Sequence, residues 1–171
     1  GGTGGHLYPS IAIAQEIARR RPETEMHFII GTREIERKII EGAGYAFDTI
    51  PVKGFPRKIS LAIASFIWNL ELSVMKSFKI LYKFKPSAIM ATGGYVSAPP
   101  VLAGWFMKIP VFLLEQNSYP GIASKKLAPF ADTVFLGFRD AERYFGKRVR
   151  TEVTGNPVRK DVTDSITPNA A

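Results

Sequence analysis

The sequence predicts an α/β protein with a Rossmann-like, doubly wound parallel sheet. Short apolar segments typical of buried strands alternate along the whole chain with longer segments whose apolar residues recur at helical spacing. This alternation is the pattern of strand–helix–strand units, which build parallel sheets. Polar, glycine-containing turns follow several of the expected strands, and open sheets of this class bind ligands at such turns.

The first half of the chain is expected to hold three helices and two strands. Ile13, Ala14 and Ile17 share one helical face, and the arginines after them suit the negative end of a helix dipole. Gly42 or Gly44 is expected to close the second helix. Helices are expected at residues 10–21, 33–44 and about 59–84, and strands at 25–32 and 45–52.

The second half continues the alternation. Strands are expected at 87–92, 110–116, 133–137 and 151–156, and helices at 97–108, 121–131 and 139–146. We therefore expect one domain over residues 1–161 and a polar linker or tail at 162–171. Because a strand normally precedes the first glycine loop of such a sheet, the first strand is expected to be missing from this sequence.

Composition excludes several kinds of site. The chain of 171 residues contains no cysteine, which rules out disulfides and thiolate metal ligands. No uncharged apolar run reaches the roughly 20 residues that span a bilayer. A DxD pair that could hold a metal diphosphate is absent, since Asp161 and Asp164 have a different spacing. We therefore expect no metal and no other cofactor in this domain.

Positive charge is concentrated in one part of the chain. The net charge is +8, and between Lys53 and Lys85 there are seven basic residues and a single acidic one, Glu71. Such a basic patch indicates an anionic partner. Nucleic acid is the least expected partner, because the lysines alternate with bulky apolar residues instead of flanking a stacking platform.

The chain opens with GGTGGHLYP, a glycine run before an expected helix. Glycines at such a turn let the backbone approach a ligand, and the N–H groups at the start of a helix suit phosphate. The dinucleotide-binding fingerprint fits poorly, because its third glycine would fall at Leu7. Arg33 could still contact a 2′-phosphate, so a non-enzymatic NADP-binding or membrane-docking module stays open as an alternative.

Three more polar loops follow expected strands. They contain Gly93 and Gly94, then residues 115–117, then residues 155–159. The carboxyl ends of parallel strands meet at one edge of a sheet, so these loops are expected to lie together. Four loops of this kind favour a ligand site over a set of ordinary turns.

Four motifs together resemble the N-terminal domain of the MurG family, bacterial inverting glycosyltransferases of the GT-B fold. They are GGTGGHLYPSIAIA, GGYVSAPPVLA, EQNSYPG and GNPVR, and the resemblance extends from Gly1 to about Asp161. It implies transfer of N-acetylglucosamine from UDP-GlcNAc to lipid I, the undecaprenyl-pyrophosphoryl-MurNAc-pentapeptide, to give lipid II. It also implies that the C-terminal UDP-sugar domain is absent here and that this chain alone is inactive.

The resemblance assigns roles to individual residues. Contact with the UDP-GlcNAc donor is implied for Thr3, Gly4, Gly5, Asn117 and Arg159. Contact with the acceptor's pyrophosphate is implied for Gly93, Gly94, Tyr95 and Ser97. A related lipid glycosyltransferase with a dolichol- or diacylglycerol-linked acceptor is the alternative within the same fold.

Inverting transfer needs a base for the acceptor hydroxyl. His6 is the first candidate, because an imidazole titrates near neutral pH, and its alternative role is a hydrogen bond that holds the loop. Glu115 is the second candidate, with hydrogen bonds to loop amides as its alternative role. His27 lies inside an expected strand, where a structural role is favoured.

The helix expected at 59–84 carries two apolar stripes. The stripe expected to face the core consists of Ile63, Ile67, Leu70, Val74, Phe78 and Leu81. The second stripe is flanked by lysines and is expected to dip into an anionic membrane surface, unless other parts of the protein cover it. The expected membrane residues are Leu61, Trp68, Leu72, Met75, Lys76, Lys79, Lys83 and Trp105. With the resemblance, this predicts a peripheral protein on the cytoplasmic face of the bacterial plasma membrane.

Overall fold

The helices and strands of the structure follow the expected order. A computed structural model describes residues 3–52 and 62–158, with side chains from residue 5 and, after the gap, from residue 65. The α-helices are α1 (Thr3–Arg20), α2 (Glu34–Gly42), α3 (Ala62–Phe84), α4 (Ala98–Phe106) and α5 (Ile122–Leu127). The strands are β1 (His27–Ile30), β2 (Ala46–Thr49), β3 (Ile89–Ala91), β4 (Val111–Glu115), β5 (Thr133–Leu136) and β6 (Thr151–Val153). The 3-10 helices are η1 (Tyr95–Ser97), η2 (Ala128–Phe130) and η3 (Arg139–Tyr144).

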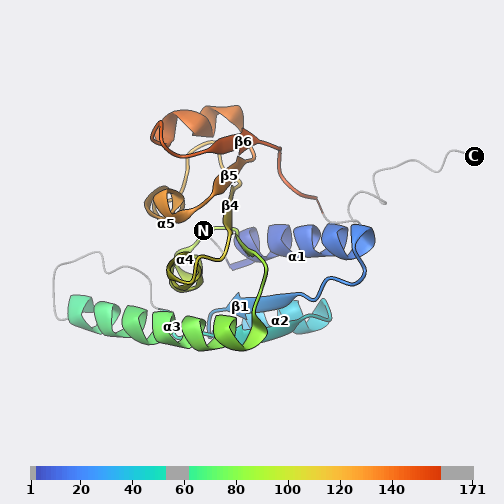
Figure 1. The fold of residues 1–171 in the computed structure, drawn as a ribbon, viewed down its shortest axis with the longest axis vertical. Helices are drawn as coiled ribbons and strands as arrows, with labels where there is room; N and C mark the ends of the chain where they lie inside the picture. The colour runs from blue at the N-terminus through green and yellow to red at the C-terminus, as the bar shows by residue number, and fades with distance from the viewer. Residues whose placement is uncertain (1–2, 53–61, 159–171) are drawn as a thin grey trace, which may run out of the picture.

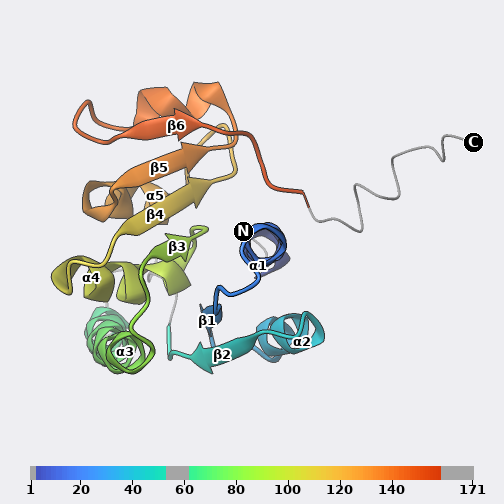
Figure 2. The same ribbon diagram turned by 45° about the vertical axis from the view of Figure 1, so that its right-hand side comes forward.

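All six described strands pair in parallel, as predicted, but they form two sheets. β1 pairs with β2, while β3, β4, β5 and β6 pair in that order. Figure 2 shows the β1–β2 pair below the four-stranded sheet. No described strand joins β1 to β3, so the single sheet expected from the sequence is divided at this point.

Helices cover both sides of the four-stranded sheet. In Figures 1 and 2, α4 and α5 lie on one side of β4, and α1 lies on the other. The larger core cluster consists of Ala91, Val101, Val111, Leu113, Leu127, Ala128, Val134, Leu136 and Ala141. These apolar residues come from β3, β4 and β5 and from the helices on the α4 and α5 side. A smaller cluster joins α1, β1 and α2 through Ile11, Ile30 and Ile40.

The glycine-rich start of the chain is helical and not a loop before the helix. α1 begins at Thr3, whereas the sequence predicts a helix only from residue 10. Glycine in a helix costs about 1 kcal/mol relative to alanine, so local preference disfavours this start. The compensating contacts are tertiary, because both the ring and the carbonyl of His6 bond to Thr92 after β3.

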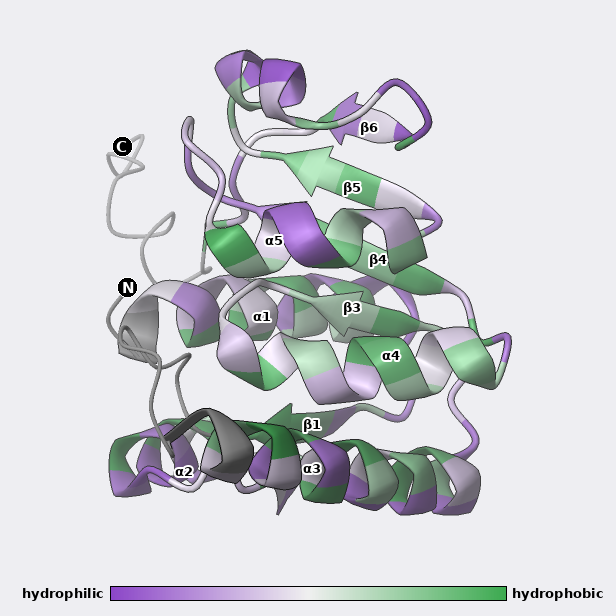
Figure 3. Cartoon of the chain, turned by 90° about the vertical axis from the view of Figure 1, so that its left-hand side faces the viewer, coloured by the Kyte–Doolittle hydropathy of each residue, from purple (hydrophilic) through white to green (hydrophobic). Residues whose placement is uncertain are grey.

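The buried face of α3 is rotated from the predicted one. Leu81 is buried as expected, but Ile67 of the predicted core stripe is 49% exposed, and Ser73 and Ser77 are completely buried. The two hydroxyls are satisfied by backbone carbonyls, since Ser73 Oγ donates to Pro51 O at 3.0 Å and Ser77 Oγ to Ser73 O at 2.8 Å. Because serine is small and both hydroxyls are hydrogen-bonded, these residues let α3 pack closely against its neighbours, including α4 (Figure 3). A search for apolar residues at helical spacing does not detect buried serines.

The last two predicted helices contain 3-10 turns. The helix expected at 139–146 is the 3-10 helix η3, and the one expected at 121–131 is α5 continued by η2. The tail expected at 162–171 lies outside the described residues. Within residues 3–52 and 62–158, no helix is long and apolar enough to cross a bilayer.

Candidate active site at the carboxyl edge of the sheet

A cavity of about 270 Å³ lies at the carboxyl edge of the four-stranded sheet. The start of α1, the loop after β3, the loop after β4 and the first residues of α5 form its walls. The lining residues are Gly5, His6, Gly94, Tyr95, Glu115, Gln116, Asn117, Gly121, Ile122, Ala123 and Ser124. Three of the four loops that the sequence predicts to gather therefore meet around one cavity.

The fourth loop, after β6, joins the others through Asn156. Asn156 Nδ2 donates a hydrogen bond to Gln116 O at 3.0 Å, which ties the loop after β6 to the loop after β4. Gly137, directly after β5, leaves room for this side chain, because a Cβ at position 137 would overlap Asn156 Oδ1. A larger residue at Gly137 would displace the Asn156 side chain and with it the hydrogen bond to Gln116 O.

His6 is bonded to Thr92 through both its ring and its backbone. His6 Nδ1 lies 2.7 Å from Thr92 O, and Thr92 Oγ1 donates to His6 O at 2.8 Å. His6 is half-buried and lines the cavity. The loop-holding hydrogen bond considered from the sequence is therefore present, and it engages only one of the two ring nitrogens.

Gly93 and Gly94 have the backbone conformation and the space that only glycine provides here. Their φ angles are +87° and +79°, in the left-handed region that other residues rarely adopt. A Cβ at Gly93 would lie 3.3 Å from His6 Cε1, and a Cβ at Gly94 would lie 3.3 Å from His6 Cδ2. The backbone of this loop therefore packs directly against the imidazole of His6.

The other two residues predicted to contact the acceptor pyrophosphate lie differently. Tyr95 is 44% exposed and lines the cavity. Ser97 is buried, and its Oγ donates to Gly93 O at 2.7 Å. This hydroxyl holds the shape of the glycine loop, and Ser97 is outside the cavity lining.

Glu115 is buried, and both of its carboxylate oxygens accept hydrogen bonds from its own loop. Oε1 accepts from Asn117 N and from Asn117 Nδ2, each at 2.9 Å. Oε2 accepts from Gly121 N at 3.0 Å, and the side chain is only 3% exposed. Three N–H groups occupy the carboxylate oxygens, so this geometry favours loop positioning over proton transfer for Glu115.

The structure describes only two of the five predicted donor residues in full, Gly5 and Asn117. Gly5 and Asn117 line the cavity. Thr3 and Gly4 belong to the first turn of α1, of which the backbone alone is described, and Arg159 lies outside the described residues.

Thr92, Ser10 and Gln116 belong to the same hydrogen-bond network but were missed as candidates. Ser10 Oγ donates to His6 O at 3.0 Å and lies 2.8 Å from Thr92 Oγ1, and Gln116 Nε2 donates to Thr92 O at 3.0 Å. The available signal was position, because Thr92 directly precedes Gly93 and Gln116 directly follows β4. The distance of 86 residues between His6 and Thr92 concealed their pairing.

His27 is not part of this site. It lies in β1, its Nε2 is 2.9 Å from Asp48 Oδ2 on β2, and its ring lies 5.2 Å from that of Phe84 on α3. These contacts support the structural role favoured from the sequence.

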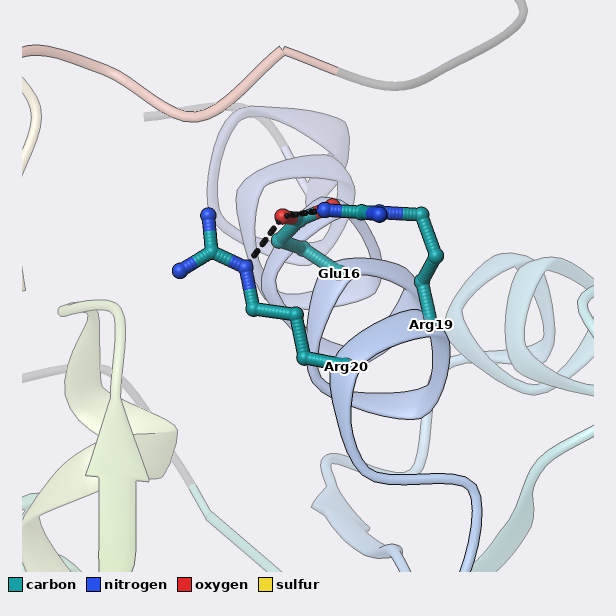
Figure 4. Close-up of polar contacts among 3 residues, drawn as sticks. All are labelled: Glu16, Arg19 and Arg20. Carbon is teal, nitrogen blue, oxygen red and sulfur yellow. Dashed lines mark hydrogen bonds and ion pairs between the residues drawn. The ribbon is translucent and has the colours of Figure 1, made fainter.

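The C-terminal end of α1 carries a separate charged cluster (Figure 4). Arg19 Nε donates to Glu16 Oε2 at 2.9 Å, and Arg20 Nε donates to Glu16 Oε1 at 2.6 Å. The hydrogen bond from Arg19, followed by that from Arg20, lowers the pKa of Glu16 to about 2. Because the cluster is exposed to water, we assign it little weight in stability.

The outer face of α3 exposes large apolar side chains beside lysines. The described members of the predicted membrane stripe are Trp68 (62% exposed), Leu72 (41%) and Met75 (61%). Tyr82, 74% exposed and seven positions after Met75, extends the same stripe and was not predicted. Lys76, Lys79 and Lys83 are exposed, and Leu61 lies outside the described residues.

Two exposed aromatic residues of α4 lie next to this helix. Trp105 is 47% exposed and Phe106 is 64% exposed. The ring of Phe106 lies 6.3 Å from that of Phe78 on α3, and Trp105 and Phe106 are in edge-to-face contact with centroids 5.0 Å apart. We call the exposed residues Trp68, Leu72, Met75, Tyr82, Trp105 and Phe106, with Lys76, Lys79 and Lys83, the α3 patch.

Comparison with known proteins identifies the family of the chain. The N-terminal domain of glycosyltransferase family 28 matches residues 1–136. The chain belongs to glycosyltransferase family 28. The glycosyltransferase family implied by the four motifs is thereby confirmed over residues 1–136.

Two curated relatives of this chain carry the same name. The UDP-N-acetylglucosamine–N-acetylmuramyl-(pentapeptide) pyrophosphoryl-undecaprenol N-acetylglucosamine transferase of Halothermothrix orenii is 40% identical over 164 residues, which is 95% of this chain and 44% of that protein. The protein of the same name from Caldanaerobacter subterraneus subsp. tengcongensis is 37% identical over 162 residues, again 95% and 44%. The chain therefore spans less than half the length of these relatives.

Solved structures share the fold of this chain. The crystal structure of Acinetobacter baumannii MurG matches 95% of this chain and 45% of that chain, with a TM-score of 0.73 and 22% identity. UDP-GlcNAc 2-epimerase from Neisseria meningitidis, solved with UDP-GlcNAc bound, matches 91% of this chain and 45% of that one, with a TM-score of 0.64 and 18% identity. At these identities the likeness concerns the fold alone.

Proposed function

We propose that this chain is the acceptor-side, N-terminal half of a glycosyltransferase that moves N-acetylglucosamine from UDP-GlcNAc to lipid I, giving lipid II. The observation that carries the proposal is a cavity lined by the start of α1 and the loops after β3 and β4, with the loop after β6 tied to it through Asn156, in a chain whose relatives, 36–40% identical, are named for this transfer. The domain covers residues 1–161, and the sugar-nucleotide half is supplied by a second domain.

In the proposed reaction, His6 takes the proton of the acceptor hydroxyl. The hydroxyl oxygen forms a bond to the anomeric carbon, and the bond from that carbon to the phosphate oxygen of UDP breaks. UDP leaves with the electron pair, and the hydroxyl proton moves to the imidazole. His6 lines the cavity with one ring nitrogen engaged, whereas Glu115 already accepts three N–H bonds, so the geometry favours His6 as the base.

The remaining site residues receive their proposed roles from the same arrangement. Gly93, Gly94 and Tyr95 are proposed to contact the acceptor pyrophosphate, with Ser97 holding their loop. Gly5 and Asn117, together with Thr3, Gly4 and Arg159, are proposed to contact the UDP-GlcNAc donor where the second domain closes over the cavity. No metal or other cofactor takes part in this proposal.

We also propose that the α3 patch places the protein on the cytoplasmic face of the plasma membrane. Large exposed apolar residues flanked by lysines suit an anionic bilayer surface, because the apolar groups gain burial and the ammonium groups gain attraction to lipid headgroups. The undecaprenyl chain of lipid I stays in the bilayer, so docking there brings the cavity to its acceptor. The protein is then a peripheral membrane enzyme.

The decisive experiment is a transfer assay with UDP-GlcNAc and a lipid I analogue. The chain is assayed alone and fused to the C-terminal half of the Halothermothrix orenii relative, which we call the fused protein. We expect no turnover by the chain alone, since orientation of donor and acceptor needs both domains, and steady turnover by the fused protein. Turnover by the chain alone would refute the donor assignment, and a folded but inactive fused protein would count against the function.

A further inference from the structure

The carbonyl of Thr92 collects hydrogen bonds from two side chains that border the cavity. It lies 2.7 Å from His6 Nδ1 and accepts from Gln116 Nε2 at 3.0 Å. Thr92 follows β3 directly and is only 7% exposed. The partners of this carbonyl therefore come from α1 and from the loop after β4, and they meet at a buried point.

The bond to this carbonyl determines which nitrogen of His6 carries the proton. A backbone carbonyl can only accept, so Nδ1 must be the donor. A neutral imidazole with hydrogen on Nδ1 has its lone pair on Nε2. Within the described residues Nε2 has no hydrogen-bond partner, and the ring lines the cavity.

The hydroxyls of Thr92 and Ser10 hold the backbone of His6 at the same time. Both donate to His6 O, at 2.8 Å and 3.0 Å, and the two hydroxyl oxygens lie 2.8 Å apart. Two hydroxyl protons are shared among three short O···O contacts. Either hydroxyl can therefore donate to the other while the second one still donates to His6 O. Gly93 and Gly94 pack against the ring and restrict its rotation.

We propose that Thr92 is a positioning residue for His6, and that Ser10 and Gln116 assist it. Thr92 fixes the imidazole as the Nδ1–H tautomer and leaves Nε2 to receive the proton of the attacking hydroxyl. When Nε2 is protonated, the imidazolium donates a charge-assisted bond to Thr92 O, which stabilises the charge that forms. The catalytic consequence rests on the proposed function, whereas the tautomer itself does not.

The first test follows the imidazole nitrogens of His6 by NMR in the isotope-labelled chain, without substrate. In the neutral imidazole, we expect one proton-bearing nitrogen, Nδ1, and an unprotonated Nε2. Thr92→Val keeps the branched shape and removes the hydroxyl bond to His6 O, so the ring is held less firmly against the backbone carbonyl of Thr92 and we expect a measurable fall in the fraction of the Nδ1–H tautomer. Thr92→Ser, which keeps the hydroxyl, should restore the signature of the unmodified chain.

The matched control is Thr151→Val, at the opposite end of the strands. Its hydroxyl donates to Glu142 Oε1 at 3.0 Å, away from the cavity. We expect this variant to leave the His6 signals unchanged. A dominant Nε2–H tautomer in the unmodified chain, or identical His6 signals in Thr92→Val, would overturn the proposal whatever the enzyme does.

The second test measures catalysis in the fused protein. We expect Thr92→Val to lower kcat about three- to tenfold with KM unchanged, and to move the acidic limb of the pH profile, with Thr92→Ser close to the unmodified protein. An unchanged kcat and acidic limb in Thr92→Val would refute positioning by Thr92 while leaving His6 as base. Full activity of His6→Ala would instead refute the base assignment of the proposed function.

Discussion

The carboxyl edge of the sheet buries polar side chains, whereas the outer face of α3 exposes apolar ones. At the edge, polar groups are buried and hydrogen-bonded: Thr92 (7% exposed) bonds to His6, 86 positions away, and Glu115 (3% exposed) bonds within its own loop. On α3, Trp68 and Met75 are each more than 60% exposed beside lysines. The first region satisfies its groups internally, and the second leaves its apolar groups in water.

This difference separates what each region can do before it meets a partner. A hydrogen-bonded polar network holds catalytic groups in one geometry, and the free energy of ordering and desolvating them is already included in folding. An exposed apolar surface contributes favourable free energy only when a partner removes it from water. Changes at the edge should therefore alter rate or stability, while changes on the α3 patch should alter binding and leave the fold intact.

The largest expected effect removes the central group of the edge. His6→Ala in the fused protein should lower kcat by about 10²–10⁴-fold, the usual contribution of a general base, and should raise KM far less. His27→Ala, which removes an imidazole outside the cavity, is the control and should keep most of kcat. A loss of less than roughly tenfold in His6→Ala would transfer the base role to Glu115 or to water.

The next effect concerns the α3 patch. Replacing Lys76, Lys79 and Lys83 with glutamine should weaken binding to phosphatidylglycerol vesicles by on the order of 100-fold at low salt, at about 1 kcal/mol per charge. The loss should shrink at high salt, because the Debye length shortens. Trp68→Ser should weaken binding at both salt concentrations, since its contribution is burial. Co-sedimentation across a salt series measures both.

Two controls sharpen this prediction. A triple variant with the same charge change elsewhere on the surface, at Lys38, Lys126 and Lys147, should bind almost like the unmodified chain. Neutral vesicles should bind the unmodified chain more weakly than anionic ones. If the α3 triple variant binds anionic vesicles normally at low salt, the α3 patch is a protein contact and the membrane proposal is wrong.

A smaller effect tests the packing of the glycine loop against His6. Gly94→Ala forces alanine into a left-handed conformation and against the imidazole, and should cost about 1–3 kcal/mol in the free energy of unfolding. Gly42→Ala is the control, because a Cβ at position 42 of α2 would have no atom within 4 Å. Chemical denaturation of the chain should show a large loss only for Gly94→Ala; equal midpoints would contradict the tight packing.

The smallest effect is expected at the exposed cluster on α1. The pKa of Glu16 is lowered to about 2 from 4.5, so its favourable pairing with Arg19 and Arg20 is fully present above pH 4.5 and is lost as the pH falls toward 2. An NMR titration of the Glu16 carboxyl should have its midpoint near 2. Because these groups are exposed, Glu16→Gln should leave the unfolding midpoint at pH 7 unchanged within error; a clear loss would contradict that weak role.

The sequence by itself determined the fold class, the order of the helices and strands, and the gathering of the loops. Apolar runs and glycine turns are local signals, and parallel strands necessarily place their carboxyl ends at one edge. The exposed apolar stripe of α3 was also readable, because Trp68, Leu72 and Met75 recur at helical spacing. The cavity of the candidate site therefore follows from topology.

Only the tertiary structure decided how the groups at that edge are used. The helical start at Thr3, the burial of Ser73 and Ser77, and the capture of Glu115 by Asn117 and Gly121 depend on contacts that apolar periodicity does not encode. The pairing of His6 with Thr92 joins residues 86 positions apart and sets the tautomer of the imidazole. A hydrogen bond is short-ranged and directional, so its partners are known only when the folded chain brings the two atoms together.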